Sequence, residues 1–247
     1  GTSTVTNNDG SIASQVRANP SAGFSICTYT GNGTINSTIG HGLNAAPEFI
    51  IVKNRSNSYA WAVLHTSVGT TGTTLNGSPE YYMLQLDSTA ARNNFTNDNI
   101  WHPTSSTFKI NGEGTGSWVN ASGDNYVAYC FAPVAGYSAM GSYTGNGSTD
   151  GPFVYTGFKP RWIMIKKVTD GAENWRIVDT ARDTYNLADA EIYANSNSAE
   201  LSSDLCDILS NGFKIRVSFS GSNTSGKEYI YIAFASNPFA SNGGLAR

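Results

Sequence analysis

The chain of 247 residues carries 15 Lys and Arg against 18 Asp and Glu, a formal net charge of −3, and only 13% of its residues are charged. A net negative chain without a Lys/Arg cluster lacks the surface that phosphate backbones require, so nucleic-acid binding is not expected. No apolar run approaches the roughly 18 residues of a membrane span, so membrane insertion is not expected either. The aromatic share of 12% predicts sizeable hydrophobic cores beneath polar loops.

The chain opens with a polar, turn-rich stretch, and residues 1–22 are predicted to form a connector with one short strand around residues 12–16. Segments of β-branched and aromatic residues follow, each bounded by Gly, Asn, Pro or Ser, which is the pattern of short antiparallel strands. In the first part of the chain these segments are residues 24–30, 48–54, 59–66, 80–87, 106–111 and 124–132. In the second part they are residues 137–144, 152–156, 161–168, 173–179, 190–194, 212–219 and 227–235. Leu201, Leu205 and Leu209 are spaced four apart and predict one short helix over residues 202–209.

The pentapeptide Tyr-Thr-Gly-Asn-Gly occurs twice, at residues 29–33 and 143–147. Further blocks match in the same order, namely residues 47–53 with 160–166, 60–66 with 174–180, 108–110 with 213–215 and 125–132 with 228–235. This order predicts an internal duplication. The expected fold is all-β, with two tandem antiparallel β-sandwich units of the jelly-roll or lectin-like kind. The units are residues 23–134 and 135–247, and a closed barrel per unit is the second choice.

Several residues are given structural roles by the repeat. The Asn-Gly pairs of the pentapeptide suit a type I′ hairpin turn, which needs positive φ at both central residues. Trp61 and Trp175 hold the same place in both copies, which predicts core packing. Lys53 and Lys166 close matching strands and are predicted to be solvated strand ends.

The three cysteines, Cys27, Cys130 and Cys206, are not kept in register by the repeat, so buried thiols are expected rather than a disulfide framework. The three histidines show no metal-ligand spacing. No metal and no cofactor is therefore predicted.

The candidate catalytic residues are pairs of carboxylates, because a glycosidase needs two carboxylates at a set separation. Candidates such as Glu113 with Asp124, or Asp179 with Asp183, have no equivalent in the other copy. Asp179 aligns with His65, which excludes a duplicated catalytic centre. The prediction is that the chain is not an enzyme, and a polysaccharide depolymerase with a single centre stays an alternative.

The loops found in only one copy are the candidate binding site. Residues 92–105 carry Trp101 and His102, and the next loop carries Trp118 and Asp124. An aromatic face beside polar side chains suits a sugar ring, whose C–H face stacks while its hydroxyls form hydrogen bonds. In the competing interpretation, both tryptophans are loop anchors that plug the ends of the core.

The repeated blocks resemble carboxy-terminal repeat modules of tail-fibre and other tail proteins of tailed bacteriophages. The likeness covers nearly the whole chain. In the first copy it rests on AGFSI (22–26), GHGL (40–43), APEFIIVK (46–53), YVAYCFA (126–132) and GYS (136–138). In the second copy it rests on DGPFVYTGF (150–158), LSNGFK (209–214) and AFASNPF (233–239). The first residues resemble the inter-module linker of these proteins, so a further module is expected upstream.

The resemblance implies a virion protein that is assembled in the bacterial cytoplasm and exposed on the particle surface, with other virion proteins as partners. It supplies no catalytic residues. Phage fibres are commonly trimeric, so a homo-oligomer, a trimer by analogy, is expected. The predicted function is a tail-fibre-type structural module whose loops contact a host cell-surface glycan. The alternatives are a capsid-decoration or other purely structural virion protein without a receptor, and the depolymerase.

Overall fold

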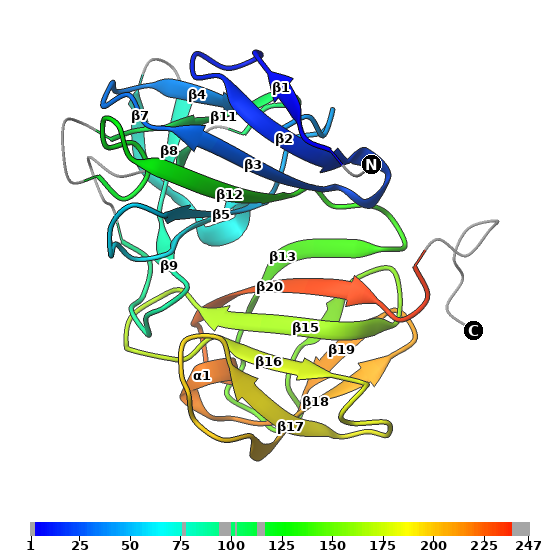
Figure 1. Cartoon of the computed structure of the whole chain (residues 1–247). Helices are drawn as coiled ribbons and strands as arrows, with labels where there is room; N and C mark the ends of the chain where they lie inside the picture. Colours follow the sequence, from blue (N-terminus) through cyan, green and yellow to red (C-terminus); the bar gives the residue numbers. More distant parts are fainter. Residues whose placement is uncertain (1–2, 76–77, 94–99, 102, 113–116, 239–247) are drawn as a thin grey trace. The chain divides into compact units, whose positions relative to one another are not determined.

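The computed structural model describes residues 3–75, 78–93, 100–101, 103–112 and 117–238. The chain divides into two compact units, the first made of residues 1–86 with 92–132 and the second of residues 87–91 with 133–247 (Figure 1). Both consist of antiparallel strands, so the fold is all-β, as predicted. The helical elements of the described residues are single turns: η1 (Pro20–Ala22), η2 (Thr66–Val68) and α1 (Ser220–Asn223).

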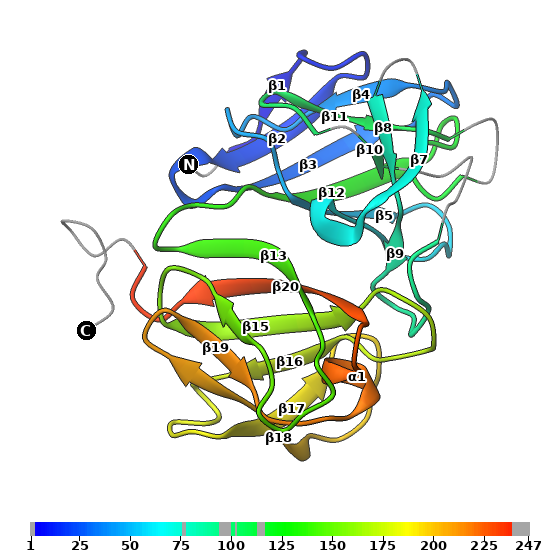
Figure 2. The same ribbon diagram turned by 180° about the vertical axis from the view of Figure 1, so that it is seen from behind.

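The first unit contains a seven-stranded sheet, a three-stranded sheet and a two-stranded hairpin. The large sheet has the order β1 (Val5–Asn7), β2 (Ser14–Asn19), β3 (Phe24–Thr30), β12 (Asn125–Phe131), β5 (Phe49–Asn54), β6 (Ala62–His65) and β9 (Leu84–Gln85). The small sheet has the order β10 (Ile100–Trp101), β11 (Thr107–Ile110) and β4 (Ser37–Gly40). The hairpin pairs β7 (Thr70–Leu75) with β8 (Ser78–Tyr81), and β8 lies against β10 (Figure 2).

The second unit has one strand order that runs from β13 to β14. It is β13 (Ser138–Thr144), β20 (Glu228–Ala235), β15 (Pro160–Lys167), β16 (Arg176–Asp179), β17 (Ala188–Tyr193), β18 (Leu201–Leu209), β19 (Gly212–Ile215) and β14 (Phe153–Tyr155). Its central order β13-β20-β15-β16 parallels β3-β12-β5-β6 of the first unit, and β19-β14 parallels β11-β4. Each unit encloses its own hydrophobic core.

The predicted helix at residues 202–209 is wrong, because this stretch is strand β18, which pairs with β17 and β19. Asp204 has φ +43°, and the pairing register with β17 shifts at this point. This irregularity breaks the strict alternation of a strand, so that Leu205 and Cys206 are both buried. The resulting leucine spacing imitates a helical period.

The expected hairpin turn in the repeated pentapeptide is also wrong. Strand β3 continues through the pentapeptide to β4, but β4 pairs with β11 in the other sheet, and in the second unit β14 pairs with β19. Among the Asn-Gly pairs only the glycines have positive φ, 67° at Gly33 and 72° at Gly147. The pentapeptide is therefore a crossing from one sheet to the other in the first unit and from one end strand to the other in the second, and a type I′ turn is excluded.

Lys166 is not a solvated strand end, since its side chain is fully buried. Its Nζ donates to the main-chain oxygens of Thr89 at 3.1 Å and Lys167 at 2.9 Å. Burial lowers the pKa of Lys166 to about 8. The matching Lys53 is half-buried and donates to the Tyr59 main-chain oxygen.

The repeated tryptophans differ in burial, with Trp175 fully buried and Trp61 half-buried. All three cysteines are buried and free, in line with the expected thiols. Burial raises the pKa of the Cys130 and Cys206 thiols, which keeps these two groups protonated and inert.

Candidate functional site

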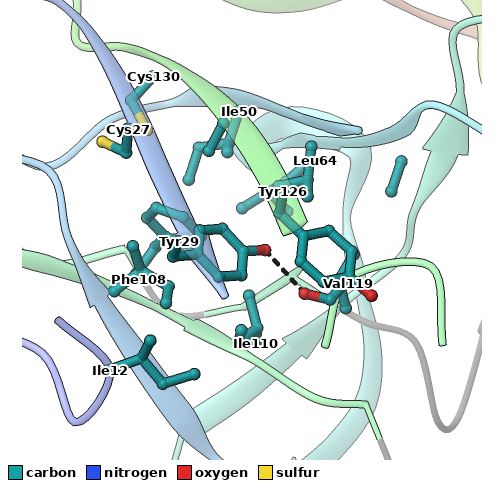
Figure 3. Packing of buried hydrophobic residues seen from close by; sticks show 14 of the residues in the cluster. Ile12, Cys27, Tyr29, Ile50, Leu64, Phe108, Ile110, Val119, Tyr126 and Cys130 are labelled. Carbon is teal, nitrogen blue, oxygen red and sulfur yellow. Dashed lines mark hydrogen bonds between the residues drawn. The ribbon is translucent and has the colours of Figure 1, made fainter. Parts of the chain in front are cut away.

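The candidate loop of the first unit, residues 117–124, is held by two stacked tyrosines. The rings of Tyr29 on β3 and Tyr126 on β12 lie 5.0 Å apart and nearly parallel (Figure 3). Tyr29 Oη donates to the Val119 main-chain oxygen at 2.7 Å, and Tyr126 Oη donates to that of Ser117 at 3.0 Å. Tyr126 Oη also accepts a hydrogen bond from the Ala121 N–H at 2.8 Å. Burial raises the pKa of Tyr29 well above its ordinary value, so its hydroxyl remains a donor.

A buried asparagine in the same loop explains the pentapeptide. The Asn120 side chain is fully buried, and its Oδ1 accepts from the Asn32 N–H at 3.0 Å. Its Nδ2 donates to Asn32 Oδ1 at 3.1 Å and to the Thr34 main-chain oxygen at 2.8 Å. A buried amide needs hydrogen-bond partners for both its oxygen and its nitrogen. The pentapeptide and the adjoining Thr34 supply these partners for the Asn120 side chain.

The first glycine of the pentapeptide is required by a close approach. A Cβ at Gly31 would lie 2.2 Å from the Ala121 main-chain oxygen, a distance that no side chain tolerates. The main chains also exchange hydrogen bonds here, from Gly31 N to Asp124 O at 2.8 Å and from Gly123 N to Gly31 O at 2.9 Å. Main-chain hydrogen bonds therefore join the loop to the end of strand β3.

The second unit has the same frame. Tyr143 and Tyr229 stack at 5.0 Å. Tyr143 Oη donates to the Ser222 main-chain oxygen at 2.8 Å, and Tyr229 Oη donates to that of Ser220 at 2.7 Å. The Thr224 N–H donates to Tyr229 Oη at 2.8 Å. The loop at residues 220–224 is thus held as residues 117–121 are.

Asn223 takes the place of Asn120. Its Oδ1 accepts from the Asn146 N–H at 2.8 Å, and its Nδ2 donates to the main-chain oxygens of Ser148 at 2.6 Å and Val217 at 2.8 Å. The frame is the same in both units, whereas the loops differ, with Trp118 standing where the other loop has Gly221.

Two of the predicted ligand-binding residues lie within the described structure of this loop. Trp118 is half-buried and packs against the hydrophobic core. Asp124 Oδ2 accepts from Asn54 Nδ2 at 2.7 Å and from Asn57 Nδ2 at 2.8 Å, so it holds the neighbouring turn. Both contacts are of the kind that the loop-anchor interpretation describes, and a ligand contact by either residue stays a prediction.

The other candidates fall largely outside the described residues. The main chain of Trp101 pairs with Lys109 between β10 and β11, but its side chain is outside them. His102 and Glu113 also lie outside them. The structure therefore brings Trp118 and Asp124 onto one loop and leaves Trp101 and His102 as sequence predictions.

The carboxylates of the second unit are engaged in local hydrogen bonds. Burial opposes ionisation of Asp179, but hydrogen bonds that include Arg182 Nε at 2.8 Å lower its pKa overall. Asp183 Oδ2 accepts from the N–H groups of Asp189 at 2.8 Å and Ala190 at 2.7 Å. A general acid needs a raised pKa, so the low pKa of Asp179 makes it unsuited to that role.

A buried ion pair in the second unit was not expected from the sequence. Arg176 Nη1 contacts Glu191 Oε1, and the Glu191 side chain is fully buried. Ser203 Oγ donates to Glu191 Oε2 at 2.7 Å, and the Arg176 guanidinium lies 4.2 Å from the centre of the Phe219 ring. The sequence did contain an indication of this ion pair, because the charged Arg176 aligns with the apolar Ala62 in the matched blocks.

The family described as "Domain of unknown function (DUF7483)" matches residues 1–238. The chain belongs to this family. No curated protein matches the chain. A solved structure described as "Crystal Structure of the STIV MCP" is similar over 94% of this chain and 95% of that chain, at 8% identity and a TM-score of 0.25. A similarity this low supports no conclusion about fold or function.

The buried His41 of this DUF7483 chain has a structural role. His41 Nδ1 accepts from the Leu43 N–H at 3.2 Å, and its Nε2 donates to the Thr104 main-chain oxygen at 3.1 Å. Burial lowers the pKa of His41, which keeps the ring neutral. In the part of the chain that the structure describes, no group of three His, Cys, Asp or Glu side chains could hold a metal ion. The same part contains no helix of the length and apolarity that crossing a membrane requires.

Proposed function

We propose that this chain is a non-enzymatic structural module of a bacteriophage virion protein of the tail-fibre type, exposed on the particle, whose loops contact a host cell-surface glycan. We interpret its two units as copies of one β-sandwich. The sequence resemblance supports the viral origin. The observation that carries the display function is the shared tyrosine and asparagine frame, which holds loops of different sequence in the two units.

A rigid frame under a variable loop suits recognition for a physical reason. Ordering a loop on binding costs conformational entropy, and a loop that is already fixed avoids most of this cost. The hydrogen bonds of Asn120 and Tyr126 fix residues 117–121 in this way. Sequence changes between the anchors then alter the surface without altering the scaffold.

The absence of catalysis is part of the proposal. It is supported by the engagement of Asp124 in hydrogen bonds to a neighbouring turn, and of Asp179 and Asp183 in hydrogen bonds within their own loops. The expected partners are other virion proteins, and assembly in a reducing bacterial cytoplasm suits buried thiols. A homo-oligomer is expected by analogy with phage fibres.

One observation favours a second candidate, a structural virion protein without a receptor. Trp118 packs on the core and Asp124 braces a turn, so both have structural tasks already. This candidate shares the virion location but predicts that the loop binds nothing.

Labelling of intact source virions with an antibody against this chain, seen by electron microscopy, tests the location. Label at fibres or the tail tip supports the proposal, and label spread over the capsid supports the second candidate. Purified chain should also compete with virions for adsorption to host cells, and failure to compete at micromolar concentration would contradict glycan binding. Release of reducing ends from host polysaccharide would instead identify a depolymerase.

A further inference from the structure

The two units differ at one sheet edge. In the first unit β3 is an interior strand, because β2 pairs along it from Gln15 opposite Thr28 to Asn19 opposite Phe24. In the second unit the corresponding strand β13 ends the strand order, and within the described residues its only strand partner is β20. The residues just before β13 cannot replace β2, since they already form β12 of the first unit.

The free edge of β13 carries a regular row of main-chain groups. Ser138 exchanges two hydrogen bonds with Val134 on the side away from β20, at 2.9 and 3.3 Å. Hydrogen-bonding direction alternates along an antiparallel strand. Met140, Ser142 and Thr144 therefore direct their N–H and C=O groups to the same outer side. In the described part of the chain, these groups have no hydrogen-bond partner.

This edge also lacks the usual protection against pairing. Natural sheets guard long edges with charged residues, proline or short strands. Strand β13 has seven residues, Ser-Ala-Met-Gly-Ser-Tyr-Thr, with no charge and no proline. The other end strands of the described sheets are shorter, with six residues in β7, four in β4 and β8, three in β1 and β14 and two in β9 and β10.

The second unit does not need an added strand to close its core. Tyr231 on β20 is 6% exposed, and its Oη donates to the Tyr155 main-chain oxygen at 3.3 Å. Gly141 leaves room for this ring, because a Cβ there would lie 2.9 Å from its atoms. The free edge therefore belongs to a folded unit, and adding a strand to it requires no rearrangement of the core.

We propose that β13 is an assembly edge that pairs antiparallel with β13 of a second copy of this chain. A two-fold axis at Ser142 would place this residue opposite itself and Met140 opposite Thr144 of the second copy. Each copy then satisfies three donors and three acceptors of the other. A strand without charges meets its own copy without like-charge repulsion, and such a self-complementary contact closes as a dimer.

The second copy fits this edge better than a donated β2 strand would. The pairing sense is the one the fold already uses, since β2 is antiparallel to β3. Donation of β2 by another chain would uncover Val16, which is 2% exposed in its own unit. Pairing of two β13 strands uncovers nothing. The proposal goes beyond the proposed function and does not depend on it, but it replaces the trimer expected by analogy with a dimer.

Analytical ultracentrifugation of the full chain over a range of concentrations tests the proposal. The wild-type chain should be dimeric. Ser142→Pro should be monomeric at concentrations where the wild type is fully dimeric, because it removes an outward N–H and no ladder bond to β20. Ser142→Ala keeps that N–H and should remain dimeric. Circular dichroism and thermal melts establish that each variant is folded.

Charge variants test the two-fold register independently of proline. Ser142→Lys and Ser142→Glu should each be monomeric, since like charges then face each other across the axis. An equimolar mixture should regain dimers. A monomeric or trimeric wild type would overturn the proposal, as would a dimer insensitive to Ser142→Pro and Ser142→Lys. Two monomeric charge variants that fail to pair when mixed would overturn it as well.

Discussion

Replacing Asn120 by alanine should destabilise the first unit by about 2–3 kcal/mol. The substitution leaves the Asn32 N–H and the Thr34 main-chain oxygen without their partners at 3.0 and 2.8 Å. A buried polar group left unpaired costs about 1–3 kcal/mol, so two such groups set a range of about 2–6 kcal/mol. Asn32 and Thr34 are exposed overall, so water can replace part of the hydrogen bonding that they lose. The lower end of the range is therefore expected.

Urea unfolding followed by circular dichroism measures this loss. Hydrogen exchange of residues 117–124 shows whether the affected region is the loop. Asn8→Ala is the matched control, because Asn8 is exposed and its side chain has no hydrogen bond in the described residues, so a change within about 0.5 kcal/mol is expected. Asn223→Ala should act on the second unit in the same way as Asn120→Ala acts on the first. A loss below 0.5 kcal/mol for both asparagines would refute the idea that buried amides hold these loops.

The remaining predictions concern a buried lysine, a glycine and the candidate loop. Burial lowers the pKa of Lys166 from 10.5 to about 8. At pH values between these two, the unfolded chain therefore binds more protons than the folded chain. Stability should rise by about 3 kcal/mol from pH 8 to 10.5, and urea unfolding of Lys166→Met should lack this rise. Gly145→Ala should lower the melting temperature by several degrees, because its Cβ would lie 2.3 Å from the Thr224 main-chain oxygen; an unchanged melting temperature would show that the strand end can shift. Trp118→Ala should weaken competition with virions for host cells at least tenfold if the loop binds a glycan, and unchanged competition by a folded variant would favour the anchor role.

Most strands could be predicted from the sequence because their burial follows the strand period. The predicted strand at residues 24–30 has the bounds of β3, and the one at residues 137–144 differs from β13 by one residue. The missed strands lack this signal, since β7 reads Thr-Thr-Gly-Thr-Thr-Leu and β4 reads Ser-Thr-Ile-Gly. Their pairing with β8 and β11 is decided by neighbours that local patterns do not contain.

The candidate site was harder to predict. The repeated pentapeptide was visible, but its partner Asn120 lies 88 residues from Asn32, and no local rule connects them. A long-range signal did exist, because Asn120 precedes Tyr126 by the same spacing that separates Asn223 from Tyr229. Side chains shared by both units at equal spacing were therefore better indicators of the loop frame than the tryptophans found in one unit.

Several differences between the two units lie at the pairing of β3 with β12 and of β13 with β20. In the first unit Val16 on β2 lies opposite Cys27 on β3, and Cys27 in turn pairs with Ala128 on β12, so that both paired positions of β3 and β12 hold small side chains. In the second unit the same positions hold Gly141 and Tyr231. The Tyr231 ring fills space that a covering strand would otherwise have to fill, and Gly141 makes room for this ring. Since neither change packs well without the other, the pair is best understood as the adaptation that lets the second unit stay folded with the outer edge of β13 unpaired.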